Sequence, residues 1–215
     1  MNAEETLAQL ARDVAICTKC VLHESRKKAV PGEGPMDAEI MFIGEGPGFH
    51  EDEQARPFVG ASGKFLDQLL AQAGVTREDV FISNVVKCRP PGNRDPKPEE
   101  LATCDEYLEA QIRAINPSII VTLGRFSMGK FIPSAKITAV HGTMHKVGDR
   151  FVIPMYHPAA ALHQAALKPS ILADFANLPD QLNEARRALG RKMITKKRKE
   201  TDSPSSEKPK QLSLF

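Results

Sequence analysis

The chain has 215 residues, of which 41% are hydrophobic, and this is enough for one well-buried domain and a tail. No run approaches the roughly 18 apolar residues that cross a bilayer, and the first residues lack the features of a secretory signal, so we expect a cytoplasmic protein without a membrane anchor. The net charge of +2 conceals an asymmetry: residues 186–215 carry ten basic and three acidic side chains, a net of +7, which leaves −5 for the first 185. A basic segment of this kind either meets a polyanion or only keeps the chain soluble.

In chain order, the sequence predicts short buried strands that alternate with helices. Apolar residues at helical spacing from Leu7 to Val14 predict a first helix that ends at Cys17, and a loop rich in proline and glycine follows. The expected strands cover residues 39–44, 80–86, 118–123 and 151–154, the last paired with 143–147 in a hairpin. The expected later helices cover residues 61–73, 98–115, 124–131 and 170–189, the last interrupted at Pro179. This alternation indicates an α/β fold in which helices cover both faces of a mainly parallel, four-stranded sheet.

Polar segments follow three of the expected strands at their carboxyl ends. They are Gly44-Glu45-Gly46-Pro47-Gly48, Ser83-Asn84 and Tyr156-His157-Pro158-Ala159. The carboxyl ends of parallel strands form one edge of a sheet, and ligands bind beyond that edge. We therefore expect the three segments to converge on one cleft.

The four cysteines form a single pattern. Cys17 and Cys20 are separated by two residues, and Cys88 and Cys104 follow later in the chain. Disulfides do not persist in a reducing cytosol, and four unrelated buried thiols would be a coincidence. Four thiolates hold either a zinc ion or an iron–sulfur cluster, and the spacing does not decide between the two.

Together these motifs resemble those of the family 4 uracil-DNA glycosylases, the bacterial and archaeal branch that carries a 4Fe-4S cluster. The resemblance covers roughly residues 8–181. It includes the cysteine spacing, the segment Gly44 to Gly48, and the motifs Arg56-Pro57-Phe58-Val59-Gly60, Asn84-Val85-Val86-Lys87-Cys88-Arg89-Pro90-Pro91 and His157-Pro158-Ala159. It implies a three-layer αβα uracil-DNA-glycosylase-like fold and a monofunctional enzyme that releases uracil from DNA and leaves an abasic site for base excision repair. It also implies that Cys17, Cys20, Cys88 and Cys104 bind the cluster.

The resemblance gives the polar segments specific roles. A glycosylase flips deoxyuridine out of the duplex and breaks the bond between C1′ and N1, so that positive charge grows on the sugar and negative charge on uracil. Asn84 can donate to O4 and accept from N3–H, the face by which uracil differs from cytosine. His157 can donate to O2 as the uracil anion forms, and Glu45 can orient water and stabilise the oxocarbenium ion.

Three further residues are expected to contact the nucleotide. Gly46 would let the backbone approach it closely, and Phe58 would stack on the flipped base. Glu51 belongs to the family's active-site segment, and we expect it to help to exclude the methyl group of thymine.

Two features depart from the family pattern. The segment after Ala159 is less bulky and less basic than is common in the family, so the residue that wedges into the duplex is not identified. The basic, histidine-bearing insertion of the subfamily that becomes covalently trapped on uracil is absent around residues 88–95, so we expect ordinary turnover. Two alternatives stay open: a glycosylase for another damaged base, and a non-catalytic iron–sulfur module that binds DNA.

The chain ends in a short apolar peptide. It follows a charged, proline-containing stretch that cannot bury a core, and it resembles the bacterial sliding-clamp binding motif, with contacts from Gln211, Leu212, Leu214 and Phe215. We therefore expect a glycosylase domain over residues 1–189, a basic disordered linker over 190–210 and a clamp-binding peptide over 211–215. The expected partners of this monomer are uracil-containing single- or double-stranded DNA and the bacterial DNA sliding clamp.

Overall fold

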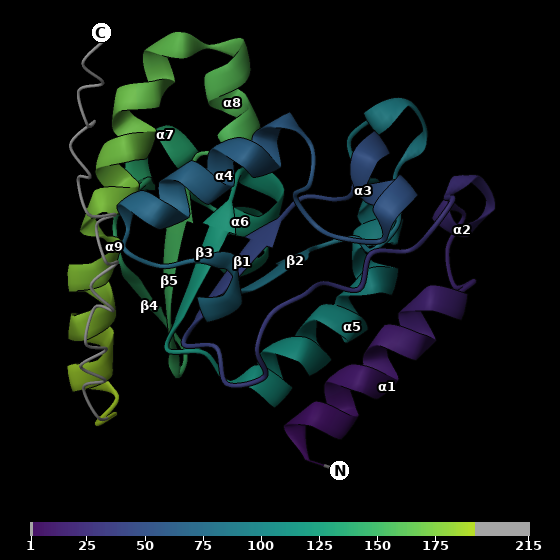
Figure 1. Ribbon diagram of the computed structural model, residues 1–215, viewed down its shortest axis with the longest axis horizontal. Helices are drawn as coiled ribbons and strands as arrows, with labels where there is room; N and C mark the ends of the chain where they lie inside the picture. Colours follow the sequence, from purple (N-terminus) through teal and green to yellow (C-terminus); the bar gives the residue numbers. More distant parts are fainter. Residues whose placement is uncertain (1, 192–215) are drawn as a thin grey trace, which may run out of the picture.

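The computed structural model describes residues 2–191, and its central feature is a five-stranded sheet between two layers of helices (Figure 1). The strands are β1 Ile40–Gly44, β2 Phe81–Asn84, β3 Ile119–Leu123, β4 His145–Val147 and β5 Arg150–Met155. The α-helices are α1 Ala3–Ile16, α2 Leu22–Ser25, α3 Phe49–Gln54, α4 Ala61–Gln72, α5 Pro98–Ile115, α6 Arg125–Phe131, α7 Ile137–Val140, α8 Pro158–His163 and α9 Lys168–Ala188. The 3₁₀ turns are η1 Arg77–Asp79, η2 Pro91–Asn93 and η3 Ala165–Leu167.

The strand order β2-β1-β3-β5-β4 places β3 at the centre of the sheet. β2, β1, β3 and β5 run parallel, whereas β4 pairs antiparallel with β5. The predicted parallel sheet is confirmed, but the first arm of the predicted hairpin adds a fifth strand to the four expected. Gly148 makes the turn of this hairpin possible, because its φ of 59° is readily adopted only by glycine.

Helices bury both faces of the sheet, whose inner strands β1 and β3 are buried along their whole length. α4 and α9 cover one face, with Leu69 and Phe175 in the core they form with the strands. α5 covers the other face through Leu108 and Ile112, and α6 joins it there. α1 lies along the outer side of α5 (Figure 1), so the first helix reaches the sheet mainly through its neighbour. The three-layer αβα architecture is therefore confirmed.

Helix α9 corrects one prediction. Pro179 lies inside this helix, which continues from Lys168 to Ala188 without the expected interruption. Proline removes one main-chain hydrogen bond, but Leu178 and Leu182 beside it are buried against the sheet, so packing maintains the helix. The helices α3 and α8 were not predicted, because six residues are too few to show a helical period.

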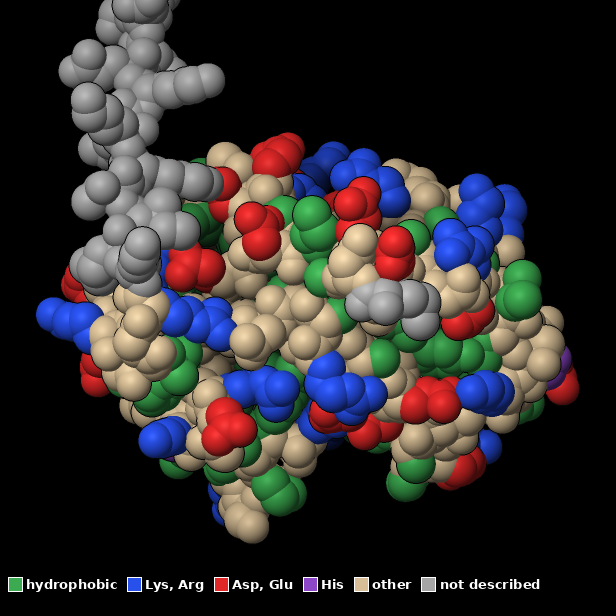
Figure 2. Space-filling view, turned by 90° about the horizontal axis from the view of Figure 1, so that it is seen from below, with side chains coloured by type: hydrophobic (Ala, Val, Ile, Leu, Met, Phe, Trp, Pro, Cys, Tyr) green, Lys and Arg blue, Asp and Glu red, His purple; other side chains and the backbone are tan. Residues whose placement is uncertain are grey.

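No helix within residues 2–191 is long and apolar enough to cross a membrane. Figure 2 views the molecule from below, facing the end of the sheet where the parallel strands begin. Lys and Arg side chains are interspersed there with Asp and Glu, so this face does not present a surface of one sign to a polyanion. The polar segments predicted to form a cleft lie at the opposite end of the strands.

Candidate active site

A cavity of about 460 Å³ lies beyond the carboxyl ends of β1, β2 and β5. This volume is in the usual range of small-molecule sites. Glu45, Asn84 and His157 all line the cavity, so the predicted convergence of three polar segments is confirmed. Gly46 and Phe58 line it as well.

Phe58 and His157 face each other across a short distance in this cavity. Their ring centroids are 5.4 Å apart and their planes differ by 26°. Gly44 leaves room for the arrangement, because a Cβ on it would lie 2.7 Å from Cζ of Phe58 and 2.4 Å from Oδ1 of Asn84. The structure therefore brings an aromatic ring, an imidazole and an amide together at the end of β1.

The side chain of Asn84 is buried with an unused acceptor. The residue ends β2, is 2% exposed and pairs in register with Gly44. Its main-chain oxygen accepts a hydrogen bond from Nζ of Lys87 at 2.9 Å. Its side-chain oxygen Oδ1 is buried and has no hydrogen-bond partner within residues 2–191. Such a buried acceptor is unfavourable unless a ligand donates to it.

His157 is held in one tautomer by its own helix. It caps the start of α8, where its Nδ1 accepts the main-chain N–H of Ala159 at 3.1 Å. The proton of the neutral ring is therefore on Nε2. Burial lowers the pKa of His157 to about 4, and the nearby charge of Glu51 only partly opposes this. At neutral pH the side chain is thus an uncharged donor through Nε2.

Glu45 contributes a half-buried carboxyl group to the cavity. Burial raises the pKa of Glu45, the charge of Asp95 raises it further, and Arg125 opposes both. Asp95 and Arg125 themselves form an ion pair at the surface. The site therefore places an acidic group in an environment that strengthens its electrostatic effects.

Glu51 lines the cavity, but its carboxylate is engaged by the main chain. Oε2 accepts from the N–H of Gly48 at 3.1 Å, and Oε1 accepts from the N–H groups of Val59 at 2.8 Å and Gly60 at 2.9 Å. Glu51 thus joins the segment after β1 to the segment that carries Phe58. The expected role in excluding thymine stays a prediction.

Asn93 is a cavity-lining residue that the sequence reasoning did not identify. It has a φ of 55°, and its Oδ1 accepts from Nε of Arg89 at 2.7 Å. The available signal was Gly92-Asn93, a turn dipeptide directly after the motif that contains Asn84, since asparagine tolerates the left-handed conformation. Its side chain adds an amide to the rim of the site.

Comparison with known proteins decides the family. Residues 31–178 match the family model of the Uracil DNA glycosylase superfamily. The chain belongs to this superfamily. Within it, the type-4 uracil-DNA glycosylase of Archaeoglobus fulgidus is 45% identical over 184 residues, which cover 81% of this chain and 92% of that protein. The type-4 enzyme of Thermotoga maritima is 46% identical over 176 residues, covering 80% of this chain and 92% of the relative. The predicted family 4 resemblance is therefore confirmed.

In this type-4 superfamily member, the four cysteines line a second, smaller pocket. Cys17 and Cys20 follow α1, Cys88 follows β2, and Cys104 lies in α5. Among residues 2–191, no group of three or more His, Cys, Asp or Glu side chains has the arrangement needed to hold a single metal ion. The structure places the four thiols around one pocket, and their binding of a metal or cluster stays a prediction.

Two N–H donors point at these thiols, whereas burial opposes their ionisation. Nη1 of Arg26 lies 3.0 Å from Sγ of Cys88, and the main-chain N–H of Lys87 donates to Sγ of Cys104 at 3.3 Å. Burial raises the pKa of the Cys104 thiol to about 11, and it also raises that of Cys88 despite Arg26. Cys88 and Cys104 therefore keep their protons at neutral pH unless a bound cation displaces them.

The predicted partner-binding residues of this glycosylase-superfamily chain lie outside the described residues. They are Gln211, Leu212, Leu214 and Phe215. The predicted linker over 190–210 is described only as far as Arg191. The domain boundaries and the clamp contact therefore stay predictions.

Proposed function

We propose that this protein is a monofunctional uracil-DNA glycosylase that hydrolyses the N-glycosidic bond of deoxyuridine in DNA. It releases uracil and leaves an abasic site for base excision repair. The observation that carries the proposal is the buried Oδ1 of Asn84, which lacks a partner among residues 2–191 and lines a cavity with Phe58 and His157. Uracil supplies a donor to this oxygen at N3–H, whereas cytosine presents an acceptor at N3. The wrong base would leave a buried acceptor unpaired, which costs about 1–3 kcal/mol.

The residues divide the chemistry between the two charges that develop. As the bond between C1′ and N1 breaks, the Nε2–H of neutral His157 donates to O2 of the departing uracil anion. The carboxylate of Glu45 orients the attacking water and stabilises the cationic sugar. Phe58 offers the face of its ring to the base, which holds the flipped nucleotide during the reaction.

The same cavity argues against strand cleavage. No lysine in the described part of the chain lines it, and a Schiff base with the sugar requires such an amine. Lys87 lines the cysteine pocket instead. A non-catalytic DNA-binding module would not explain why a neutral imidazole and an unpartnered amide face one cavity.

Leu162 is the residue that we propose to wedge into the duplex. It lies on α8 two residues after the cavity-lining residue Ala160, and it is 52% exposed. An exposed apolar side chain beside the base pocket suits insertion between base pairs, because it replaces the stacking lost by the flipped nucleotide.

For the cofactor, we propose a 4Fe-4S cluster held by Cys17, Cys20, Cys88 and Cys104. Four sulfurs around one pocket, with N–H donors to two of them, fit the donor set of such a cluster. When bound, the cluster would crosslink the end of α1, the chain after β2, and α5.

The proposed partners are uracil-containing DNA, single- or double-stranded, and the bacterial sliding clamp. The peptide over residues 211–215 would bind the clamp and tether a monomeric enzyme near replicated DNA. Four free cysteines suit a reducing compartment, so we place the protein in the cytoplasm.

The decisive experiment is incubation with a labelled oligonucleotide that contains one deoxyuridine, followed by alkaline cleavage at abasic sites. We expect cleavage at that position, and none for matched oligonucleotides with thymidine or deoxycytidine. Excision of another damaged base with uracil left intact would favour the alternative glycosylase. Tight DNA binding without any abasic product would contradict catalysis altogether.

A further inference from the structure

Phe58 is held in a backbone conformation that it would not adopt by itself. Its φ of 52° is in the left-handed region, which is sterically disfavoured for a residue with a Cβ. The residue is nevertheless buried, with its ring against His157 in the cavity. The surrounding structure must therefore impose this conformation.

Arg77 contacts the main chain of this segment from outside the cavity. It belongs to η1, just before β2. Its Nη2 donates to the carbonyl oxygen of Pro57 at 2.5 Å, and its Nη1 donates to that of Phe58 at 2.9 Å. One planar guanidinium thus fixes two consecutive carbonyl groups, which restrains the peptide planes on both sides of the Phe58 Cα.

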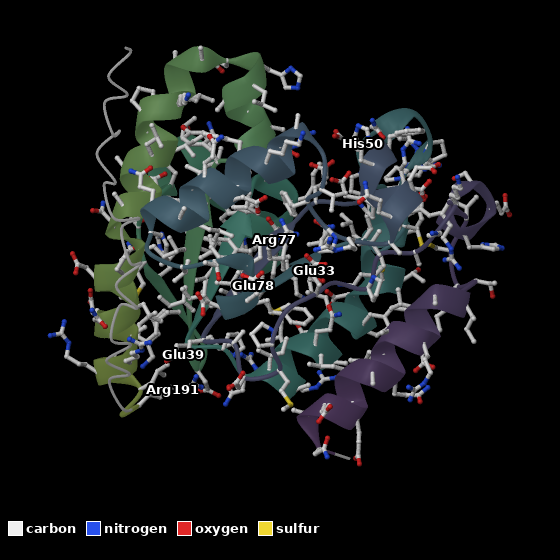
Figure 3. The ribbon with its side chains drawn as sticks, viewed as in Figure 1. Glu33, Glu39, His50, Arg77, Glu78 and Arg191 are labelled. Atoms are coloured by element: carbon white, nitrogen blue, oxygen red, sulfur yellow. The ribbon has the colours of Figure 1, made fainter. Side chains whose placement is uncertain are left out.

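The guanidinium is itself fixed by two carboxylates. Oε1 of Glu33 accepts from Nε of Arg77 at 3.2 Å and from Nη2 at 2.7 Å, and Oδ1 of Asp67 accepts from Nη1 at 3.0 Å. Figure 3 shows Arg77 and Glu33 next to each other beside the sheet. Glu33 is anchored in turn, because its main chain forms a bridge with Ile82 of β2. Arg77 is therefore rigidly attached to the strand that ends in Asn84.

The next two residues of the segment are held from the cavity side. The N–H groups of Val59 and Gly60 donate to Glu51. A Cβ on Gly63 would lie 1.9 Å from the carbonyl oxygen of Phe58, so the first turn of α4 closes tightly over the same peptide. Of these restraints, Arg77 is the one that connects the Phe58 segment to β2.

We propose that Arg77 is a positioning residue for base stacking, which keeps the ring of Phe58 in register with Asn84 and His157. This inference rests on the proposed excision of uracil, for which Phe58 would stack on the flipped base. The side chain of Arg77 does not line the cavity, so it acts through Phe58 and not on the nucleotide. If Arg77 only stabilised the fold, its ion pair with Glu33 would be enough. The two hydrogen bonds to the carbonyl groups of Pro57 and Phe58 indicate that it also positions this segment.

The test compares Arg77→Met with a matched control, Arg186→Met. Arg186 also bonds a glutamate through two nitrogens, Glu39, and its side chain is 11% exposed against 18% for Arg77. Glu39 lies away from Arg77, toward the lower end of the sheet in Figure 3. We expect single-turnover excision by Arg77→Met to fall by about 10- to 100-fold, because small misplacement of a reacting group has this effect. The affinity of Arg77→Met for a duplex with an uncleavable analogue of deoxyuridine should also weaken. Arg186→Met should leave both the excision rate and this affinity unchanged.

A double-mutant cycle separates positioning from general damage. If Arg77 acts through Phe58, Arg77→Met should lower the rate in the wild-type background but change it less than twofold in a Phe58→Ala background. Equal losses in both backgrounds, or equal losses for Arg77→Met and Arg186→Met at equal Tm shifts, would overturn the proposal. An inactive wild-type protein would instead overturn the proposed function. An Arg77→Met variant that excises uracil as fast as an active wild type would overturn this inference alone.

Discussion

The ammonium group of Lys87 lies 2.9 Å from the main-chain oxygen of Asn84. Lys87 is 1% exposed and also donates to Oγ of Ser83 at 2.5 Å and to Oε1 of Gln111 at 2.8 Å. Its main-chain N–H donates to Sγ of Cys104. One buried residue therefore joins the cavity that would read the base to the pocket that gathers the cysteines.

Lys87→Met should be strongly destabilising. The substitution keeps most of the volume but removes three buried hydrogen bonds, so we expect the free energy of unfolding to fall by about 2–4 kcal/mol. Urea denaturation would measure this. Lys64→Met, at an exposed position of α4, is the control and should change stability by less than about 0.5 kcal/mol. Equal stability of both variants would mean that the network around Lys87 contributes nothing.

Asn84→Ala should impair excision far more than DNA binding. Removal of a hydrogen bond that matters in the transition state costs about 10²- to 10³-fold in rate, whereas phosphate contacts set general affinity. Single-turnover kinetics and a binding titration on the same oligonucleotide would separate the two. Asn177→Ala, exposed on α9, should behave as wild type. A near-normal rate for Asn84→Ala would remove this amide from base recognition.

His157 should remain neutral across the physiological range. Because burial lowers its pKa to about 4, the excision rate should show no inflection near pH 6.5. Burial raises the pKa of Glu45, so protonation of this carboxylate should contribute to the acid limb of the profile. The limb should therefore shift or disappear in Glu45→Gln. An inflection near pH 6.5 that is lost in His157→Ala would contradict this assignment.

The same pKa predicts a pH dependence of stability. Between pH 6.5 and about 4 the unfolded chain binds a proton on His157 that the folded protein does not, so stability should fall as the pH drops through this window. The loss should reach at most about 3 kcal/mol. Urea denaturation at pH 7.5 and 4.5 should show a steeper loss for wild type than for His157→Ala. Equal losses of stability in wild type and His157→Ala would indicate that the His157 ring is in contact with water.

Purified protein should be brown and contain about four irons per chain, because four thiols around one pocket suit a 4Fe-4S cluster. Iron and zinc analysis after anaerobic purification would measure this. Cys88→Ala should lose iron and stability together, since Cys88 lines the cysteine pocket and not the base cavity. Stoichiometric zinc without iron would instead indicate that the four cysteines form a zinc site.

Deletion of residues 211–215 should abolish clamp binding and leave excision on short oligonucleotides unchanged, because the peptide would only tether the enzyme. A direct titration with the sliding clamp would measure this. The double substitution Leu214→Ala with Phe215→Ala should match the deletion, because apolar anchors carry most of the energy of such contacts. Equal binding by the truncated and full-length proteins would show that the resemblance of residues 211–215 to a clamp-binding motif is a coincidence of composition.

Much of the architecture could be predicted from local sequence. The strands β1 and β3 are short, mainly apolar runs, and α5 starts at Pro98 and ends before Asn116-Pro117, so short-range chemistry determines them. The cavity could be predicted because its polar segments directly follow strands. The persistence of α9 through Pro179 could not, since it depends on packing against a sheet built from distant residues.

The sequence by itself determined which chemical groups this protein has at the ends of its strands, because a parallel sheet brings those ends together whatever the details of packing. Only the tertiary structure decided the protonation and the contacts of these groups. The low pKa of His157 comes from its burial in the folded protein. The contact of Arg77 with Phe58 joins residues 19 positions apart that share no motif. Hydrogen bonds and desolvation of this kind depend on atoms that meet only when the chain is folded, so no local pattern could have shown them.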